Sequence, residues 1–387
     1  MNNINNVHNC VGCLSCVDRC PKHCIHISND SLGHIHTHAE ETQCINCGLC
    51  VKSCPAIQKP DYRKPNKAYA LWRKDDTLRR QSSSGGLAAV LSERMIAEGG
   101  IVYGCAFEKP FSIKHIRCSS ADELEKLKSS KYVQSNLAGI HSQIANDLKN
   151  GKKVLFIGTP CQVATVALYT KKFGTNLFTV DVICHGVPSI QLFKSSLPTD
   201  IVECNIDKLT FRDDTAYRLK IYKSGKIIYK RELHIDLYMK GFFKAIFCRD
   251  SCHECKYTRS ERVSDLTIGD FWGVDKSQIH TNTDYGLSLA LVNSEKGHAM
   301  LRNIVSEVNM VERPMEEAIA GNKQLRFPMK KTWRSKIFKT LYPICGFKCS
   351  AVCSMPDIVL KNMIITSNPQ LSSSASFLRL NVLSSLN

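Results

Sequence analysis

The chain has 387 residues, of which 43% are hydrophobic and 22% charged, so it is long enough for more than one domain and too apolar to be disordered or low-complexity. Its formal charge of +17, from 52 Lys and Arg against 35 Asp and Glu, favours anionic cofactors or partners. No apolar run approaches the length of a membrane span, and the opening residues carry no export signal. We therefore expect a folded protein of the cytoplasm.

The chain contains 20 cysteines, and nine of them fall between residues 10 and 54. Cytosolic thiols are kept reduced, so this content argues against a disulfide scaffold and indicates metal binding. An iron-sulfur cluster with four thiolate ligands is itself an anion, so it would offset part of the positive charge. We therefore rank an anionic cofactor and a redox partner above nucleic acid, which we do not expect to bind.

Two cysteine runs near the start follow the same pattern, C-x2-C-x2-C-x3-C-P, with an offset of 34 residues. In this spacing three thiolates bind one [4Fe-4S] cluster and the fourth crosses to the other cluster. Zinc is the alternative, but zinc sites typically use paired C-x2-C ligands. The predicted ligands are Cys10, Cys13, Cys16 and Cys54 for cluster one, and Cys44, Cys47, Cys50 and Cys20 for cluster two.

Residues 1–60 resemble a bacterial two-cluster ferredoxin, and the PDYRKP stretch that follows is typical of a linker. Over residues 61–325 strand patterns alternate with helix patterns, which predicts a larger domain of mixed α/β (α+β) class with a mostly parallel sheet covered by helices. We divide it into parts at about 68–150 and 151–325. Residues 326–387 are predicted to be a basic, partly disordered tail.

The segment QSSSGGLAAVLSERMIAEGG predicts a helix from Leu87 to Glu98, preceded by Ser83, Ser84, Gly85 and Gly86. Free N-H groups at such a helix start can bind phosphate, although many helices begin this way with nothing bound. The chain has neither a G-x-G-x-x-G nor a G-x-x-x-x-G-K-[ST] motif. A flavin or nucleotide would therefore not be held by a Rossmann or P-loop device.

Further cysteines are predicted at the edge of the sheet. Cys161 and Cys184 each follow a buried strand, and the carboxyl ends of parallel strands form the usual ligand-binding edge. If the loop with Cys252 and Cys255 folds over that edge, the four thiols complete a site for a third [4Fe-4S] cluster. The alternatives are zinc at the later pair and ordinary core packing for the first two cysteines.

Six motifs now identify a resemblance. In chain order they are SSSGG, Lys131-Tyr-Val-Gln-Ser, Gly158-Thr-Pro-Cys-Gln, Cys184-His-Gly-Val-Pro-Ser, Phe211-Arg-Asp and Gly269-Asp-Phe-Trp-Gly. Over residues 68–310 the chain resembles the coenzyme F420 hydrogenase/dehydrogenase beta-subunit family. With its ferredoxin-like start, it is similar to stand-alone iron-sulfur flavoproteins of that family, to which the plant hydroxymethyl-chlorophyll reductases are related.

The resemblance implies FAD bound by a non-Rossmann fold, with an iron-sulfur cluster beside it. It implies cofactor-binding roles for Ser83, Ser84, Gly85, Gly86, Lys131, Gln134, Gly158, Thr159, His185 and Gly186. Lys131 and His185 could favour a reduced flavin or protonate a product, and a surface lysine and a turn histidine are the structural alternatives. The family's substrates are diverse, and F420 is one of them.

Clusters pass single electrons, whereas a flavin exchanges one or two, so the combination predicts an oxidoreductase that links ferredoxin or another redox protein to a two-electron organic substrate or deazaflavin. A second hypothesis is a non-catalytic electron-transfer subunit of a larger redox complex. A third is a zinc-bearing nucleic-acid binder, which the positive charge and the cysteines suggest.

Overall fold

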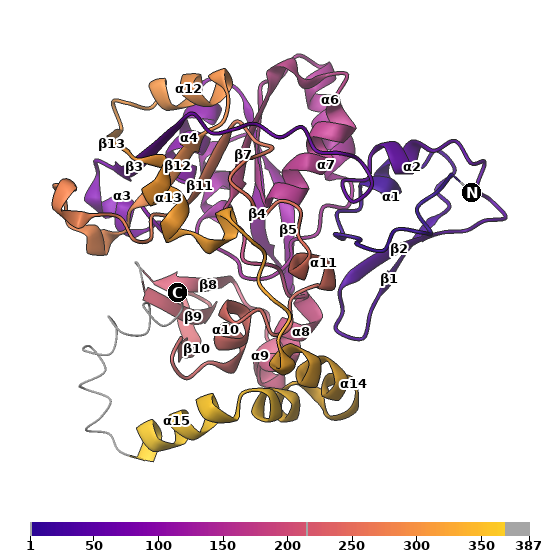
Figure 1. Ribbon diagram of the computed structural model, residues 1–387, viewed down its shortest axis with the longest axis vertical. Helices are drawn as coiled ribbons and strands as arrows, with labels where there is room; N and C mark the ends of the chain where they lie inside the picture. Colours follow the sequence, from indigo (N-terminus) through magenta and orange to yellow (C-terminus); the bar gives the residue numbers. More distant parts are fainter. Residues whose placement is uncertain (1, 214–215, 368–387) are drawn as a thin grey trace.

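The computed structural model describes residues 2–213 and 216–367. Its N-terminal part contains two short helices and one hairpin (Figure 1): α1 (Ser15–Arg19), β1 (Ile25–Asn29), β2 (Ile35–Ala39) and α2 (Leu49–Lys52). Leu14 and Gly48 precede α1 and α2 at the same place in each cysteine run, and both have a left-handed backbone, with φ of 63° and 68°. The sequence repeat is thus also a repeat of local structure.

The larger part is built on an eight-stranded sheet with the order β13-β3-β12-β11-β7-β6-β4-β5. Its strands are β3 (Lys67–Arg73), β4 (Ile101–Glu108), β5 (Ser112–Cys118), β6 (Val154–Gly158), β7 (Leu177–Val182), β11 (Leu266–Asp270), β12 (Ser288–Val292) and β13 (Val308–Arg313). The central strands β4, β6, β7 and β11 are parallel, and all remaining pairs are antiparallel.

The expected class is confirmed, but the sheet is mixed and not mostly parallel. The connection from β4 to β5 shows the reason, because it is far too short for the crossover that a parallel pair requires. Both faces of the sheet are buried. Leu155 and Val180 pack against α4 (Leu87–Ala97) on one side, and Phe156 packs near α6 (Ile140–Lys149) and α7 (Pro160–Thr170) on the other. The predicted helix over 87–98 matches α4 to within one residue.

A second, three-stranded antiparallel sheet lies below the large one in Figure 1. Its strands are β8 (Lys208–Asp213), β9 (Ala216–Lys223) and β10 (Lys226–Glu232). The remaining α-helices before residue 330 are α3 (Asp76–Arg80), α5 (Ala121–Leu124), α8 (Ile190–Ser196), α9 (Thr199–Glu203), α10 (Leu237–Phe243), α11 (Asp250–His253), α12 (Glu295–Arg302) and α13 (Met315–Gly321). Short 3-10 helices cover Glu125–Leu127, Gly174–Asn176, Lys276–Gln278, Thr283–Tyr285 and Lys323–Leu325.

The structure corrects the expectation of a tail from residue 326. Residues 333–367 form α14 (Trp333–Ser354), kinked at Gly346, and α15 (Pro356–Ser367). Phe338 and Phe347 are buried in the core beside the small sheet. The burial of these apolar side chains offsets the conformational entropy that the segment loses when it becomes ordered. Residues 368–387 lie outside the described part of the chain.

Within the described residues no single helix is long and apolar enough to cross a membrane. One bent pair meets the length and composition criteria jointly, namely α14 with Pro356–Asn362, at an angle of 76°.

Candidate functional site

The structure brings the four predicted ligands of cluster one together. Burial raises the pKa of the Cys13 thiol, and the nearby charges of Cys16 and Cys54 raise it further. The pKa of Cys16 rises to about 12 by burial, with Cys10 and Cys54 adding to the effect. The backbone N-H of Gly12 donates to the Cys10 Sγ at 3.4 Å. Mutually close, desolvated thiols with an N-H donor match the donor set of an iron-sulfur cluster.

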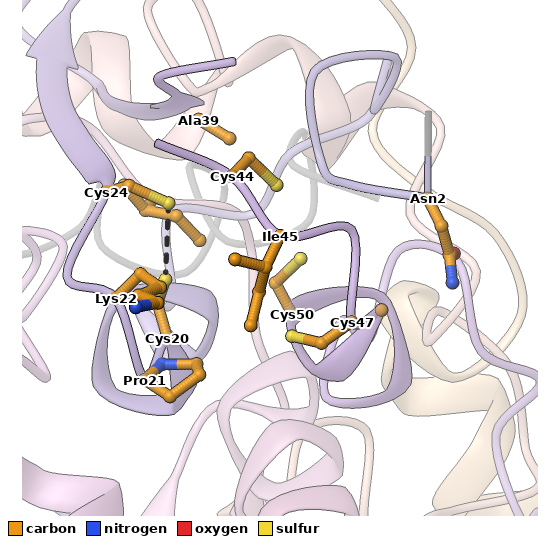
Figure 2. Close-up of a pocket in the computed structure, with 12 residues that line it drawn as sticks. Asn2, Cys20, Pro21, Lys22, Cys24, Ala39, Cys44, Ile45, Cys47 and Cys50 are labelled. Carbon is orange, nitrogen blue, oxygen red and sulfur yellow. Dashed lines mark hydrogen bonds between the residues drawn. The ribbon is translucent and has the colours of Figure 1, made fainter. Parts of the chain in front are cut away.

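The predicted ligands of cluster two line one pocket (Figure 2). Cys20, Cys44, Cys47 and Cys50 surround it, with Ile45 among them. Cys47 is exposed and Ile45 is 58% exposed, so this pocket faces outward. Cys24 belongs to neither cysteine run, but it is buried and its Sγ lies 3.5 Å from that of Cys20 at the pocket wall.

The sheet edge gathers a third set of thiols. Cys161 is the second residue of α7, just beyond β6, and Cys184 follows the end of β7. Cys252 of α11 lies close enough to both for their charges to raise its pKa, in addition to the larger effect of burial. Burial raises the pKa of Cys161 to about 11, and the charge of Cys255 contributes. Burial also raises the pKa of Cys184, and the charges of Cys161 and Cys255 add to it. Residues from three distant segments therefore meet, as the strand-edge argument predicts.

A fifth thiol, which is not among the predicted ligands, belongs to this group. Cys248 is fully buried, and its charge raises the pKa values of Cys184 and Cys252. A Cβ added to Gly186, which has φ of +104°, would lie 2.9 Å from the Cys248 Sγ. The N-H of Gly186 donates to the Cys184 Sγ at 3.4 Å, the same contact that Gly12 makes in cluster one. We call Cys161, Cys184, Cys248, Cys252 and Cys255 the core thiol site.

An aromatic pocket adjoins the core thiol site. His185 lies between Trp272 and Phe243, with ring centroids at 5.8 Å and 6.4 Å. Burial lowers the pKa of His185 to about 4, against an upward effect of Asp270, so its imidazole is neutral at pH 7. The other lining residues are Gly321, Lys323, Gln324 and Met329.

The predicted serine-glycine loop lies between the strands and the Lys131 segment. The Ser130 N-H donates to the Ser83 Oγ at 2.8 Å, and the Ser84 Oγ donates to the Leu287 carbonyl at 3.0 Å. A Cβ on Gly85 would lie 2.3 Å from the Leu71 carbonyl oxygen, so close approach to protein backbone already explains this glycine. Gly86 precedes α4 at φ 90° without a side-chain cap.

Lys131 has protein partners for all its donors. Its Nζ donates to the carbonyls of Lys126, Leu127 and Lys128 at 3.2, 3.0 and 2.7 Å. Burial lowers its pKa to about 8, and the charge of Cys105 opposes this. A structural role at the end of a short helical segment thus competes with the predicted flavin contact.

Three other predicted cofactor residues also have protein partners. The Gln134 amide donates to the Val11 carbonyl at 2.8 Å and accepts from Arg249. The Thr159 hydroxyl lies 3.2 Å from the Cys161 Sγ, which places it at the core thiol site. A Cβ on Gly158 would meet the Phe156 ring at 2.8 Å. Their cofactor-binding roles stay predictions.

The cluster-one region is joined to the sheet by buried polar contacts that no sequence motif indicated. The Asp18 carboxylate accepts from the Gly139 N-H at 2.9 Å and lies 2.8 Å from the His141 Nδ1. Tyr257 donates to the Pro55 carbonyl at 3.1 Å, and burial raises its pKa, with the charges of Cys161 and Cys13 adding to the effect. Tyr257 therefore stands between cluster one and the core thiol site.

Comparison with known proteins agrees with this geometry. Residues 9–57 match the model of the 4Fe-4S dicluster domain, and residues 151–318 match that of the C terminus of the coenzyme F420 hydrogenase/dehydrogenase beta subunit. The chain is therefore similar to this beta subunit over residues 151–318, and it carries a ferredoxin-type dicluster domain at residues 9–57. No curated protein matches it. The beta-subunit-like chain is also similar to one in the F420-reducing [NiFe] hydrogenase complex from Methanosarcina barkeri, at 17% identity and a TM-score of 0.46, covering 69% of this chain and 93% of that one.

The beta-subunit-like protein is thus an iron-sulfur electron-transfer protein with a dicluster domain. Among the residues that the structure describes, no three His, Cys, Asp or Glu side chains are placed to hold a metal ion. The two cysteine runs of the dicluster domain also form no such group. The ligands of a cubane cluster are arranged around four irons, whereas a single metal ion requires its ligands close together.

Proposed function

We propose that the protein is an oxidoreductase that passes electrons between a ferredoxin-type carrier and a two-electron organic substrate or deazaflavin, with two [4Fe-4S] clusters in the N-terminal domain, a third at the core thiol site, and FAD. When bound, the clusters supply single-electron transfer and FAD supplies exchange between one and two electrons. The cytoplasm remains the proposed location, and the boundary near residue 60 remains a proposed domain limit.

The observation that carries the proposal is the core thiol site beside the aromatic pocket. Cys161, Cys184, Cys252 and Cys255 would hold the third cluster, because their thiols are desolvated and close enough to act on one another's charge. His185, which follows Cys184 in the chain, lines the aromatic pocket. An organic ring bound in that pocket would therefore lie a short distance from the core thiols. A neutral His185 can donate one hydrogen bond to such a ring or hold a proton for it.

The test is an analysis of iron, sulfide and flavin in protein purified without oxygen. We expect about 12 irons and one FAD per chain, since each cubane contributes about four irons. Reduced ferredoxin should then bleach the flavin absorption. About eight irons would eliminate the core cluster, and flavin-free protein from flavin-replete cells would eliminate the FAD assignment.

A second candidate function is an electron-transfer subunit that serves a separate catalytic chain. It is favoured by Lys131 and Gln134, whose polar atoms are engaged by protein groups and not directed to a ligand. This function predicts about 12 or about eight irons without flavin, and reduction of a partner protein but of no small organic substrate.

A further inference from the structure

Arg249 is a buried cation without a buried anion. Its side chain is in the interior, with the residue 2% exposed, and it donates to the Cys10 carbonyl at 3.1 Å, the Ile35 carbonyl at 2.6 Å and the Gln134 Oε1 at 3.3 Å. All three acceptors are neutral. In the described part of the chain no carboxylate lies within ion-pair distance of it.

Arg249 also lies between two sets of thiols. It precedes α11, which carries Cys252, and its charge acts to lower the pKa of Cys161. On its other side it binds the cluster-one loop, where a Cβ on Gly12 would lie 2.5 Å from its Nη2. The guanidinium therefore fills the space between cluster one and the core thiol site.

Lys256 is a second cation at the contact between the ferredoxin domain and the core thiol site. Its Nζ donates to the carbonyls of Ala56 and Gln58 at 3.3 and 2.9 Å, just beyond Cys54. Burial lowers the pKa of its ammonium, and the charges of Cys54 and Cys255 act in the opposite direction. Like Arg249, it has no carboxylate at ion-pair distance among residues 2–213 and 216–367.

A comparison with Arg262 shows that a buried cation ordinarily has a carboxylate partner. Arg262 is equally buried, and it pairs with the Asp181 carboxylate at 3.0 Å, as buried cations ordinarily do. Removing a cation from water without such a partner is unfavourable, because the interior does not replace its hydration. A cluster ligated by four thiolates is an anion, and beside Arg249 it would supply the opposite charge that Asp181 supplies to Arg262.

We propose that Arg249 and Lys256 form a cationic bridge that raises the reduction potential of cluster one and of the core cluster and weakens the repulsion between electrons on the two. For cluster one the inference rests on the dicluster domain alone; for the core cluster it also rests on the function proposed above. Reduction adds negative charge to a cluster, so a fixed cation beside it stabilises the reduced state. Both are positioning residues, since neither would bind iron.

The experiment is a dye-mediated redox titration of the anaerobic full-length protein, followed by electron paramagnetic resonance. The signal of cluster one is assigned by its loss in Cys54→Ser. Arg249→Gln should lower the midpoint of cluster one by about 59 mV, the equivalent of a tenfold change in a one-electron equilibrium. Arg249→Lys, which keeps the charge, should restore most of the shift.

The matched control is Ser251→Ala. The Ser251 hydroxyl donates to the same Cys10 carbonyl at 3.1 Å but carries no charge, so its loss should leave the midpoint unchanged. A second pair, Lys256→Gln and Lys256→Arg, tests the bridge if Arg249→Gln does not retain iron. Midpoints that stay at the wild-type value in an iron-replete Gln variant would overturn the proposal, and so would an equal shift in the Gln and charge-keeping variants.

Failure of the proposed function gives a different result. If the unmodified protein contains only about eight irons, the core cluster is eliminated, while the midpoint of cluster one still decides whether Arg249 acts on it. If about 12 irons are present and neither midpoint responds to the loss of either cation, the core cluster stands and the cationic bridge is wrong.

Discussion

The ferredoxin domain and the core thiol site both gather cysteines, but in opposite ways. The first takes its ligands from residues 10–54, with three of each four on one short loop and helix. The second combines cysteines that follow β6 and β7 with cysteines in and around α11. These cysteines span 94 residues of the chain, from Cys161 to Cys255. Local spacing is sufficient for the first arrangement, whereas the second exists only after the sheet has formed.

The largest expected effect tests whether the core thiol site holds its own cluster. Cys252→Ser should remove about four of about 12 irons and leave the dicluster domain loaded, because a missing thiolate weakens metal retention. Cys204→Ser is the matched control, since Cys204 is half-buried and its Sγ contacts Lys223 of the small sheet. Iron content that is unchanged in Cys252→Ser would show that the two regions do not share the same chemistry.

Gly186→Ala should also empty the core site while sparing the ferredoxin domain. The added Cβ would press on the Cys248 Sγ at 2.9 Å, and the positive φ of 104° adds strain of about 1–2 kcal/mol. Gly225→Ala separates the two causes, because Gly225 has φ of +75° but open space around it. We expect iron loss in the first variant only. Equal iron content in both would contradict a tightly packed core site.

The contact between the two regions can be weakened at Asp18. Asp18→Ala leaves the buried His141 and the Gly139 N-H without their acceptor, which should cost about 4 kcal/mol. Hydrogen exchange should then accelerate in residues 9–57 and much less in the sheet. Asn9→Ala removes an exposed contact to Glu254 at the same junction and should have little effect. Uniform acceleration throughout the chain would contradict a separable junction.

The smallest expected effect concerns pH and lies outside both cysteine sets. Burial raises the pKa of Asp236 to about 6, although its carboxylate accepts from the Met239 N-H at the start of α10. Since the folded pKa exceeds the unfolded value, the carboxyl favours folding below about pH 4, and this contribution is lost as pH rises through about 6. Asp236→Asn should therefore gain up to about 2–3 kcal/mol relative to wild type between pH 4 and 7.

Denaturant unfolding at several pH values checks this last prediction. A constant difference between Asp236→Asn and wild type would show that Asp236 does not titrate in the folded state. The retained amide oxygen of Asn can still cap α10, so the comparison isolates the charge.

Much of the fold followed from patterns of short range. The repeat of C-x2-C-x2-C-x3-C-P predicted a dicluster domain, and that prediction is confirmed. The glycine-flanked apolar period predicted α4, and strand endings predicted that Cys161 and Cys184 meet at one edge. The expectation of a tail was wrong at α14, because the basic stretch gave no indication that Phe338 and Phe347 are buried against Phe247, which lies 91 and 100 residues earlier in the chain.

The sequence by itself determined which residues can bind metal locally, because ligand spacing, helix caps and strand periods act over a few residues. Only the tertiary structure decided that Cys248 joins the core thiols, that Gln134 binds the ferredoxin loop, and that Arg249 lies between two thiol sets. Those placements depend on long-range packing and on the low dielectric of the interior. Burial of a charge there is unfavourable unless polar or oppositely charged groups lie beside it.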